Sequence, residues 1–176
     1  MSTLMHMSLA QVGEKYRTMR ERAFRATEQN FCSLGIRIRT MQESDAAEAD
    51  AWPDTHGVRS WSWQQMRQVL QRDQKRFDVA VLAEGKLCAV CLGAPTRGKM
   101  ALKLYFIESC PVQNPLRGNV LKIVFFAAHT YAKALGSLEV HIVEPASERL
   151  VEIYSAYHYE PFSDKTGKVT HMRKAT

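Results

Sequence analysis

The stretch Pro115-Leu-Arg-Gly-Asn-Val120 decides the fold of this 176-residue chain because of the segments on either side of it. The apolar run at 102–109 predicts a strand, and the run at 120–135 predicts a helix that ends at Gly136. A short turn rich in Pro and Gly joins the two. The first N–H groups of a helix have no partner within the helix and form a natural anion site. The stretch therefore predicts a phosphate-sized anion site at the end of a strand.

The same alternation of strands and helices extends in both directions from this stretch. After Gly136, the sequence predicts a strand at 138–143 and a short helix that carries Tyr154. Ser62 and Gln65 form a capping-box pattern that opens a helix. The remaining predicted elements are a strand at 36–39, helices at 44–52 and 63–72, strands at 77–83, 87–93 and 101–109, and a final hairpin with strands at 159–162 and 168–172. This order indicates one domain of the α/β class.

The element order resembles that of the GNAT superfamily of acetyl-CoA-dependent N-acetyltransferases. Tyr131-Ala-Lys-Ala-Leu-Gly136 looks like the end of the family's loop-following helix, and Glu152-Ile-Tyr-Ser-Ala-Tyr-His-Tyr159 looks like its Tyr-containing segment. Gly118 matches the first glycine of the family's pyrophosphate loop. Val120 replaces the second small residue and Pro115 the usual Arg or Gln, so we interpret the loop as degenerate. The resemblance covers roughly residues 36–162.

The resemblance implies an α/β (α+β) fold of the GNAT type, in which helices flank a mixed central sheet, here with an extra N-terminal helix. The implied domains are an N-terminal extension at 1–35 and an acetyltransferase domain at 36–176. The implied co-substrate is acetyl-CoA, with no metal. Its pantetheine would lie where the fourth strand separates from the fifth, and its pyrophosphate at the start of the following helix. The implied cofactor-binding residues are Ser109, Cys110, Val112, Arg117, Gly118, Asn119, Val120, Leu121, Lys122 and Ser147, the last in the place of the family's asparagine.

Acetyl transfer to an amine needs a proton acceptor for the amine and a proton donor for the departing thiolate. Tyr154 takes the position of the family tyrosine and is the predicted general acid. Glu108, near the end of the strand at 101–109, is the predicted base. His141, which shares a strand face with Glu139, is the alternative base, and His56 is a weaker candidate.

The acceptor is predicted to carry an amine, on a small molecule or a protein. Acidic residues gather in the region that lines the acceptor cleft in the family, although the chain has a net charge of +6. An acidic rim would favour a cationic amine. These acidic residues are Glu43, Asp45, Glu48, Asp50 and Asp54. Trp52, Trp61 and Trp63 in the same region are interpreted as core, with an aromatic wall as the alternative.

An amphipathic helix is predicted near the N-terminus, because apolar residues recur there at spacings of three and four. The stripe consists of Leu9, Val12, Tyr16, Met19 and Ala23, and arginines occupy the other faces. We expect the stripe to pack on its own domain, with a dimer or partner surface as the alternative. An inactive GNAT-shaped assembly module that binds through this helix is therefore a second hypothesis. Nucleic acid is not the expected partner because the arginines accompany no reading motif, but an acetyltransferase guided to nucleic acid stays a third hypothesis.

Composition excludes several other classes of protein. Hydrophobic content of 45% and charged content of 24% are typical of a globular protein. The apolar runs are too short to cross a bilayer. The N-terminus lacks the pattern of a signal peptide, so the expected location is cytoplasmic.

Two cysteines have a spacing that invites a metal or redox interpretation. Cys88 and Cys91 form a C-x-x-C, but within a strand they are predicted to point to opposite faces. The sequence has no second C-x-x-C to complete a metal site. We therefore interpret the two cysteines as buried apolar residues.

Overall fold

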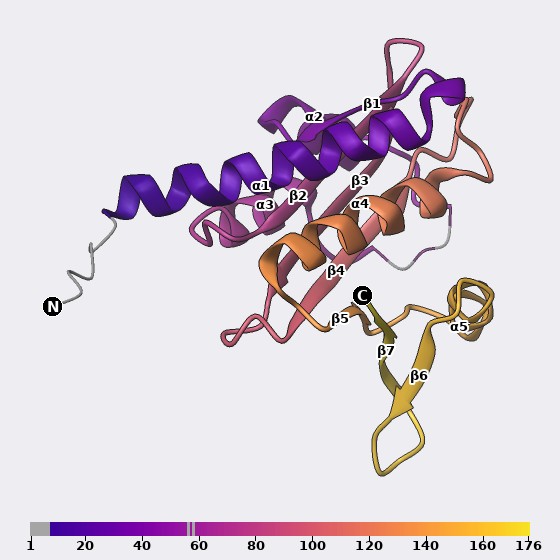
Figure 1. Cartoon of the computed structure of the whole chain (residues 1–176). Helices are drawn as coiled ribbons and strands as arrows, with labels where there is room; N and C mark the ends of the chain where they lie inside the picture. The colour runs from indigo at the N-terminus through magenta and orange to yellow at the C-terminus, as the bar shows by residue number, and fades with distance from the viewer. Residues whose placement is uncertain (1–7, 56, 58) are drawn as a thin grey trace, which may run out of the picture.

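The computed structural model describes residues 8–55, 57 and 59–176. In this part of the chain one mixed sheet has the strand order β1-β2-β3-β4-β5-β7-β6 (Figure 1). The strands are β1 (Arg37–Thr40), β2 (Phe77–Ala83), β3 (Lys86–Pro95), β4 (Ala101–Ser109), β5 (Glu139–Val143), β6 (Glu160–Ser163) and β7 (Val169–Ala175). The helices are α1 (Leu9–Asn30), the 3-10 turn η1 (Cys32–Leu34), α2 (Glu43–Asp50), α3 (Trp63–Leu70), α4 (Val120–Leu135) and α5 (Glu148–Ser155). The predicted fold class is confirmed.

Helices cover both faces of the sheet. α1 and α4 run side by side over one face, and α2 and α3 lie against the other (Figure 1). Each face has its own apolar core, one built around Phe77, Ile123 and Tyr131 and the other around Trp63 and Leu92. β4 is parallel to β5 and lies at the centre of this arrangement.

The helix α4 forms where the sequence predicts it. Its buried apolar residues, Ile123 and Tyr131 among them, face the sheet. Gly136 follows the last helical residue with φ 77°. Glycine adopts this left-handed conformation without strain and commonly ends a helix. Pattern and end signal together therefore fix the bounds of α4.

The N-terminal helix packs on its own domain. Ser8 and Gln11 cap its start reciprocally, and Tyr16 and Ala23 join the core under α1 and α4. The buried Arg20 guanidinium donates from Nη1 to the backbone oxygens of Gln74 at 2.8 Å and Arg76 at 3.1 Å. The amphipathic helix is confirmed, and most of its stripe is used inside the chain. Leu9 is the exception, with 80% of its surface exposed.

A bulge in β3 changes the direction of its cysteines. Val81 of β2 pairs with Ala89, but the next β2 residue pairs with Leu87, so Cys88 is an extra residue in the ladder. An extra residue shifts the alternation of side chains by one position. Cys88 and Cys91 consequently belong to the same core, and the prediction that they point to opposite faces was wrong. Both are buried free thiols.

A second bulge lies in β4. Leu92 pairs with Phe106 and Gly93 pairs with Leu104, so Tyr105 is the extra residue. The strands approach closely here: a Cβ on Gly93 would lie 2.4 Å from the carbonyl oxygen of Lys103. Glycine at 93 therefore permits the bulge, which bends β4 at the point where its pairing with β5 stops.

The other differences from the predicted elements are local. The α3 cap has only one half of the predicted capping box, since Ser62 Oγ accepts from Gln65 N but the reciprocal bond is absent among the described residues. Ser62 Oγ instead donates to Asp50 Oδ2 at 2.7 Å. β7 runs to Ala175 rather than 172, because its second half pairs with β5 up to that residue. No helix in the described part of the chain is both long and apolar enough to cross a membrane.

Candidate active site

The centre of the candidate site is a gap between β4 and β5. Their last pair in the described ladder is Leu104 with Ile142, and β4 then continues to Ser109 beside β3 alone. The N–H of Cys110 donates to the carbonyl oxygen of Cys88 on the β3 side at 2.9 Å. Backbone groups alternate sides along an antiparallel ladder, so those of Ile107 and Ser109 are directed into the gap. The gap is thus lined by main-chain N–H and C=O groups without a strand partner in the described ladder.

Asn114 fixes the turn between β4 and α4. Its amide nitrogen donates to the carbonyl oxygens of Cys88 at 2.8 Å and Cys110 at 3.2 Å, and its Oδ1 accepts from the N–H of Leu116 at 2.9 Å. These bonds tie the turn to the ends of both strands, so that α4 starts beside the mouth of the gap. Sequence reasoning missed Asn114, and its only local signal is the Asx-turn spacing to Leu116.

The start of α4 offers a positively polarised surface. Its N-cap residue Asn119 makes no side-chain capping bond, and the first turn holds no acidic residue. The N–H groups of Val120, Leu121 and Lys122 are the orphan donors of the helix. Two amides that we predicted to bind the pyrophosphate are already used in the turn, since Arg117 N donates to Asn114 and Asn119 N donates to Leu116.

Val120 and Gly118 play different parts in this turn. Val120 is only 5% exposed and belongs to the core between α4 and the sheet, so its methyl groups point away from the open side of the turn. Gly118 has a positive φ, and a Cβ placed there would meet no other atom, so glycine is needed for backbone conformation rather than for space. A side chain at position 120 therefore leaves the outer face of the turn open.

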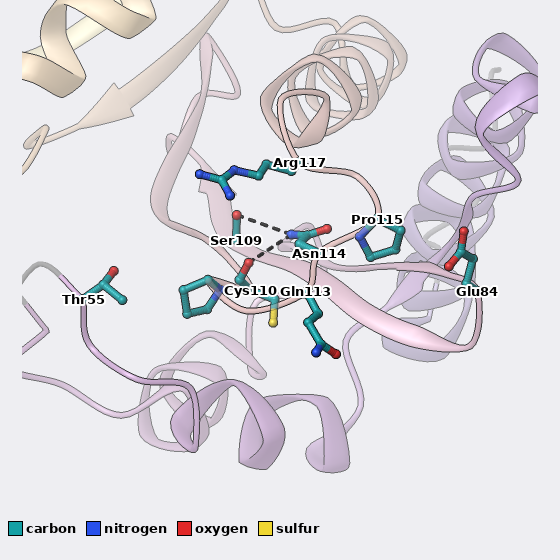
Figure 2. Close-up of a pocket in the computed structure, with 9 residues that line it drawn as sticks. Thr55, Glu84, Ser109, Cys110, Gln113, Asn114, Pro115 and Arg117 are labelled. Atoms are coloured by element: carbon teal, nitrogen blue, oxygen red, sulfur yellow. Dashed lines mark hydrogen bonds between the residues drawn. The ribbon is translucent and has the colours of Figure 1, made fainter.

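A hollow of about 740 Å³ opens at the same end of β4 (Figure 2). Arg117 enters it from the turn before α4, on the side that holds Ser109 (Figure 2). Its wall is formed by residues from β4, the following turn, the β2–β3 hairpin and the α2–α3 connection. The lining residues are Thr55, Glu84, Ser109, Cys110, Pro111, Gln113, Asn114, Pro115 and Arg117. The turn at 115–119 carries Arg117 and leads into the positively polarised start of α4, and we call it the cationic turn. The hollow connects this turn with the end of β4 and with the α2–α3 connection.

Tyr154 lies on the α4 face of the sheet, at the level of the gap. Its ring packs edge-on against Phe125, with the ring centroids 5.9 Å apart. Burial raises the pKa of Tyr154 to about 12, and the nearby Cys91, which pairs with Ile107 in the ladder, acts in the same direction. Within the described part of the chain its hydroxyl has no hydrogen-bond partner. The raised pKa keeps the hydroxyl protonated at neutral pH.

Glu108 lies on the opposite face of the sheet and is held by two partners. Both of its carboxylate oxygens are 3.2 Å from Arg59 Nη1, and Oε2 accepts from Trp63 Nε1 at 2.6 Å. Trp63 is fully buried, as its interpretation as core predicts. Sequence reasoning missed Arg59, which lies far from Glu108 in the chain and belongs to no recognisable motif.

His141 lies on the face of the sheet opposite α4 but is not close to Glu108. In the parallel ladder it pairs with Lys103, which precedes Glu108 by five residues of β4. At the usual rise of a strand, five residues span roughly 16 Å. Its Nε2 is 2.7 Å from Glu139 Oε2, and its ring stacks on His171 at 4.8 Å. The two predicted bases are therefore not brought to one point, and His56 lies outside the described residues.

Most of the expected acidic rim is used within the structure. Asp45 is buried and accepts from Arg39 Nη2 at 2.8 Å. Asp50 binds the start of α3, accepting from Trp63 N at 2.6 Å. Asp54 accepts from the N–H of Arg59 at 3.1 Å. These three carboxylates thus have partners within the chain, and the expected attraction for a cationic amine rests on Glu43 and Glu48, which are exposed on α2.

The remaining predicted residues are distributed around the site. Ser147 is the N-cap of α5, and its hydroxyl accepts from Leu150 N at 3.3 Å. Val112 is 55% exposed in the turn after β4. Lys122 is exposed in the first turn of α4 and adds a positive charge beside the cationic turn. Among the described residues, no group of three or more His, Cys, Asp or Glu side chains is arranged to hold a metal ion.

No protein-family model matches this chain, and no curated protein sequence matches it. Many solved structures share its fold. Ard1 from Thermoplasma volcanium superposes with a TM-score of 0.64 and 10% identity, over 81% of this chain and 98% of that one.

Two further structures bear on the site. The PaiA N-acetyltransferase from Thermoplasma acidophilum, in complex with coenzyme A, gives a TM-score of 0.57 and 15% identity over 80% of this chain and 99% of that one. An acetyltransferase of the GNAT family from Streptococcus pneumoniae gives a TM-score of 0.53 and 13% identity over 80% of this chain and 98% of that one. With a bulged β4 that separates from β5 and a helix start at its end, this chain has the fold of the GNAT N-acetyltransferases.

Proposed function

We propose that this protein is an acetyl-CoA-dependent N-acetyltransferase that acts on an amine of a small molecule or a protein. The observation that carries the proposal is the gap between β4 and β5 beyond Leu104 and Ile142, with a cationic turn at its mouth. A coenzyme A complex of a protein with the same fold supports the choice of donor. That neighbour is an N-acetyltransferase, and transfer of an acetyl group to nitrogen requires an amine as the acceptor.

The residues around the gap fit the chemical parts of acetyl-CoA. When bound, acetyl-CoA supplies an activated thioester together with a diphosphate. The amides at the start of α4, with Arg117 and Lys122, would hold the diphosphate. The main-chain groups of Ile107 and Ser109 would pair with the amide-bearing arm and polarise the thioester carbonyl. The start of α4 has no side-chain cap and no acidic residue in its first turn, and this supports its assignment as the diphosphate site.

Tyr154 is the proposed general acid. Its hydroxyl is protonated, has no partner among the described residues, and lies at the level of Ile107, on the face of the sheet that α4 covers. These properties suit a donor that delivers a proton to a thiolate leaving from the gap. The acceptor amine would approach from the other face, where the α2–α3 connection borders the hollow through Thr55.

The alternative of a non-catalytic assembly module has less to support it. That hypothesis needs the N-terminal stripe as a free surface, but Tyr16 and Ala23 are buried within the chain. It also needs an obstructed cofactor loop, but the Val120 side chain points into the core. A partner at the first turn of α1, near the exposed Leu9, stays a hypothesis.

Thermal unfolding with acetyl-CoA tests the proposal. At about 100 times its dissociation constant, acetyl-CoA should stabilise the fold by roughly 2.7 kcal/mol. For a chain of this size that corresponds to a rise in Tm of about 5–10 °C. Arg117→Ala should reduce the rise, whereas Arg97→Ala, which changes an exposed arginine at the other end of β4, should leave it unchanged. An unchanged Tm at millimolar acetyl-CoA would refute the proposal.

A further inference from the structure

The Arg59 guanidinium joins α2, the α2–α3 connection and β4. Its Nη1 donates to the carbonyl oxygen of Ala49 at 2.7 Å, and its Nη2 donates to those of Trp52 at 2.7 Å and Asp50 at 3.3 Å. These carbonyls are at the C-terminal end of α2, where the helix dipole attracts a cation. Only 12% of the Arg59 side chain is exposed, and its counter-ion is Glu108 at the end of β4.

Glu108 in turn is fixed to α3. Its Oε2 accepts from Trp63 Nε1, and the backbone N–H of the same tryptophan is bound by Asp50. The start of α3, the end of α2 and the end of β4 are therefore connected through one carboxylate and one guanidinium. The described residues of the α2–α3 connection, 51–55, 57 and 59–62, are anchored at both ends by this cluster, and Thr55 among them lines the hollow.

This arrangement leaves Glu108 poorly suited to take a proton from an amine. A general base needs a lone pair within hydrogen-bond reach of the proton it removes. Both oxygens of Glu108 face Arg59, and Oε2 also accepts from Trp63. Removing the carboxylate would leave a largely buried guanidinium without its counter-ion, which is strongly unfavourable. The geometry suits a residue that fixes the α2–α3 connection and the start of α3 to the end of β4, which we call an anchor.

We propose that Glu108 is a positioning residue: as the counter-ion of Arg59 and the acceptor for Trp63, it holds the α2–α3 connection against the end of β4 and so shapes the acceptor side of the site. The inference rests on the proposed acetyltransferase function for its kinetic consequences. Its structural part, the anchoring of the connection, does not depend on that function.

Conservative replacement separates an anchor from a base. In Glu108→Gln the one amide oxygen can still accept from Trp63, but the side chain neither neutralises Arg59 nor takes a proton. With acetyl-CoA and spermidine or a lysine-containing peptide as amine probes, we expect Glu108→Gln to raise the KM for the amine, because the counter-ion of Arg59 is lost, but to keep kcat within about threefold and to keep the pH profile of kcat. Glu108→Ala should raise the KM for the amine about tenfold and leave the KM for acetyl-CoA unchanged. A loss of about 10²–10⁴-fold in kcat for Glu108→Gln, with loss of the acidic limb, would identify a base and overturn the proposal.

A readout without turnover tests the anchor if neither amine is acetylated. Chymotrypsin cleaves after aromatic residues unless proline follows, so the site in the connection is Trp61, which precedes Ser62, whereas the bond from Trp52 to Pro53 is resistant. Arg59→Met should make cleavage there at least tenfold faster. Arg67→Met is the matched control, because Arg67 also donates to a main-chain oxygen, that of Met41 at 3.1 Å, but makes no described contact with Glu108. Equal cleavage rates for the wild type and Arg59→Met would overturn the proposal whether or not the protein binds acetyl-CoA.

Discussion

Gly93 of β3 and Lys103 of β4 approach so closely that a methyl group on Gly93 would lie 2.4 Å from the Lys103 carbonyl oxygen. The contact lies next to the bulge at Tyr105, where β4 bends away from β5. The geometry of the gap thus depends on the absence of one side chain on the neighbouring strand.

Gly93→Ala should therefore destabilise the fold and widen or displace the bulge. Overpacking of this kind lowers the free energy of unfolding by about 1–3 kcal/mol. We also expect a smaller rise in Tm on addition of acetyl-CoA. Gly98→Ala is the control, since its Cβ would meet Met100 at an ordinary 3.7 Å. If Gly93→Ala and Gly98→Ala have the same stability by urea unfolding, the close approach does not constrain β4.

The second prediction concerns Val120, which the resemblance to the GNAT family indicates as a defect of the cofactor loop. Because its side chain is buried, Val120→Gly should lower the free energy of unfolding by roughly 2–4 kcal/mol through lost apolar burial and helix propensity. It should not increase the rise in Tm caused by acetyl-CoA. Val112→Gly, at an exposed position of the preceding turn, should change stability little. A larger acetyl-CoA effect in Val120→Gly would mean that the side chain does obstruct the turn.

How well the sequence predicts each feature depends on how local its cause is. β2, β4 and α4 have the predicted bounds because each carries its own apolar pattern and its own end signal, such as Gly136. The bulge at Cys88 could not be predicted, because one extra residue leaves an apolar run unchanged in composition.

The candidate site shows the same limit. The sequence indicated Tyr154 as a candidate because it stands in a segment with a recognisable spacing. Arg59 was not, because its partners Glu108 and Trp52 are brought to it only by tertiary structure. The acidic residues near α2 indicated an attraction for cations, but a sequence does not reveal that Asp45 and Asp50 are used by Arg39 and by the start of α3.

A third prediction concerns acid stability. Burial, together with Lys174 and Lys133, lowers the pKa of His129 to about 4, and its Nε2 lies 2.9 Å from the Tyr159 hydroxyl. The folded state therefore favours the neutral ring, whereas the unfolded chain protonates near pH 6.5. This contribution to stability is complete above about pH 6.5 and is lost as the pH falls toward 4. The loss amounts to at most roughly 3 kcal/mol.

Urea unfolding between pH 7.5 and 4 measures this loss. His129→Gln keeps a polar group beside Tyr159 but cannot be protonated, so its stability should fall less steeply below pH 6.5 than that of the wild type. His158→Asn is a suitable control, because His158 is exposed and has a positive φ, a conformation that asparagine tolerates. Parallel curves for the wild type and His129→Gln would show that His129 does not account for the acid sensitivity.

The last prediction concerns Tyr154 as the proton donor, and it applies if the protein proves to bind acetyl-CoA. Tyr154→Phe keeps the ring that packs on Phe125 and removes only the hydroxyl, so acetyl-CoA binding and stability should change little. Loss of a positioned acid should lower kcat by about 10²–10⁴-fold. Tyr157→Phe is the matched control, because Tyr157 packs on the same phenylalanine ring at 5.3 Å. Since burial raises the pKa of Tyr154 to about 12, its proton should remain available up to pH 10, and the wild-type rate should not fall there through its ionisation. Full activity of Tyr154→Phe on an acceptor that the wild type acetylates would make Tyr154 a packing residue and would leave the departing thiolate to be protonated by water.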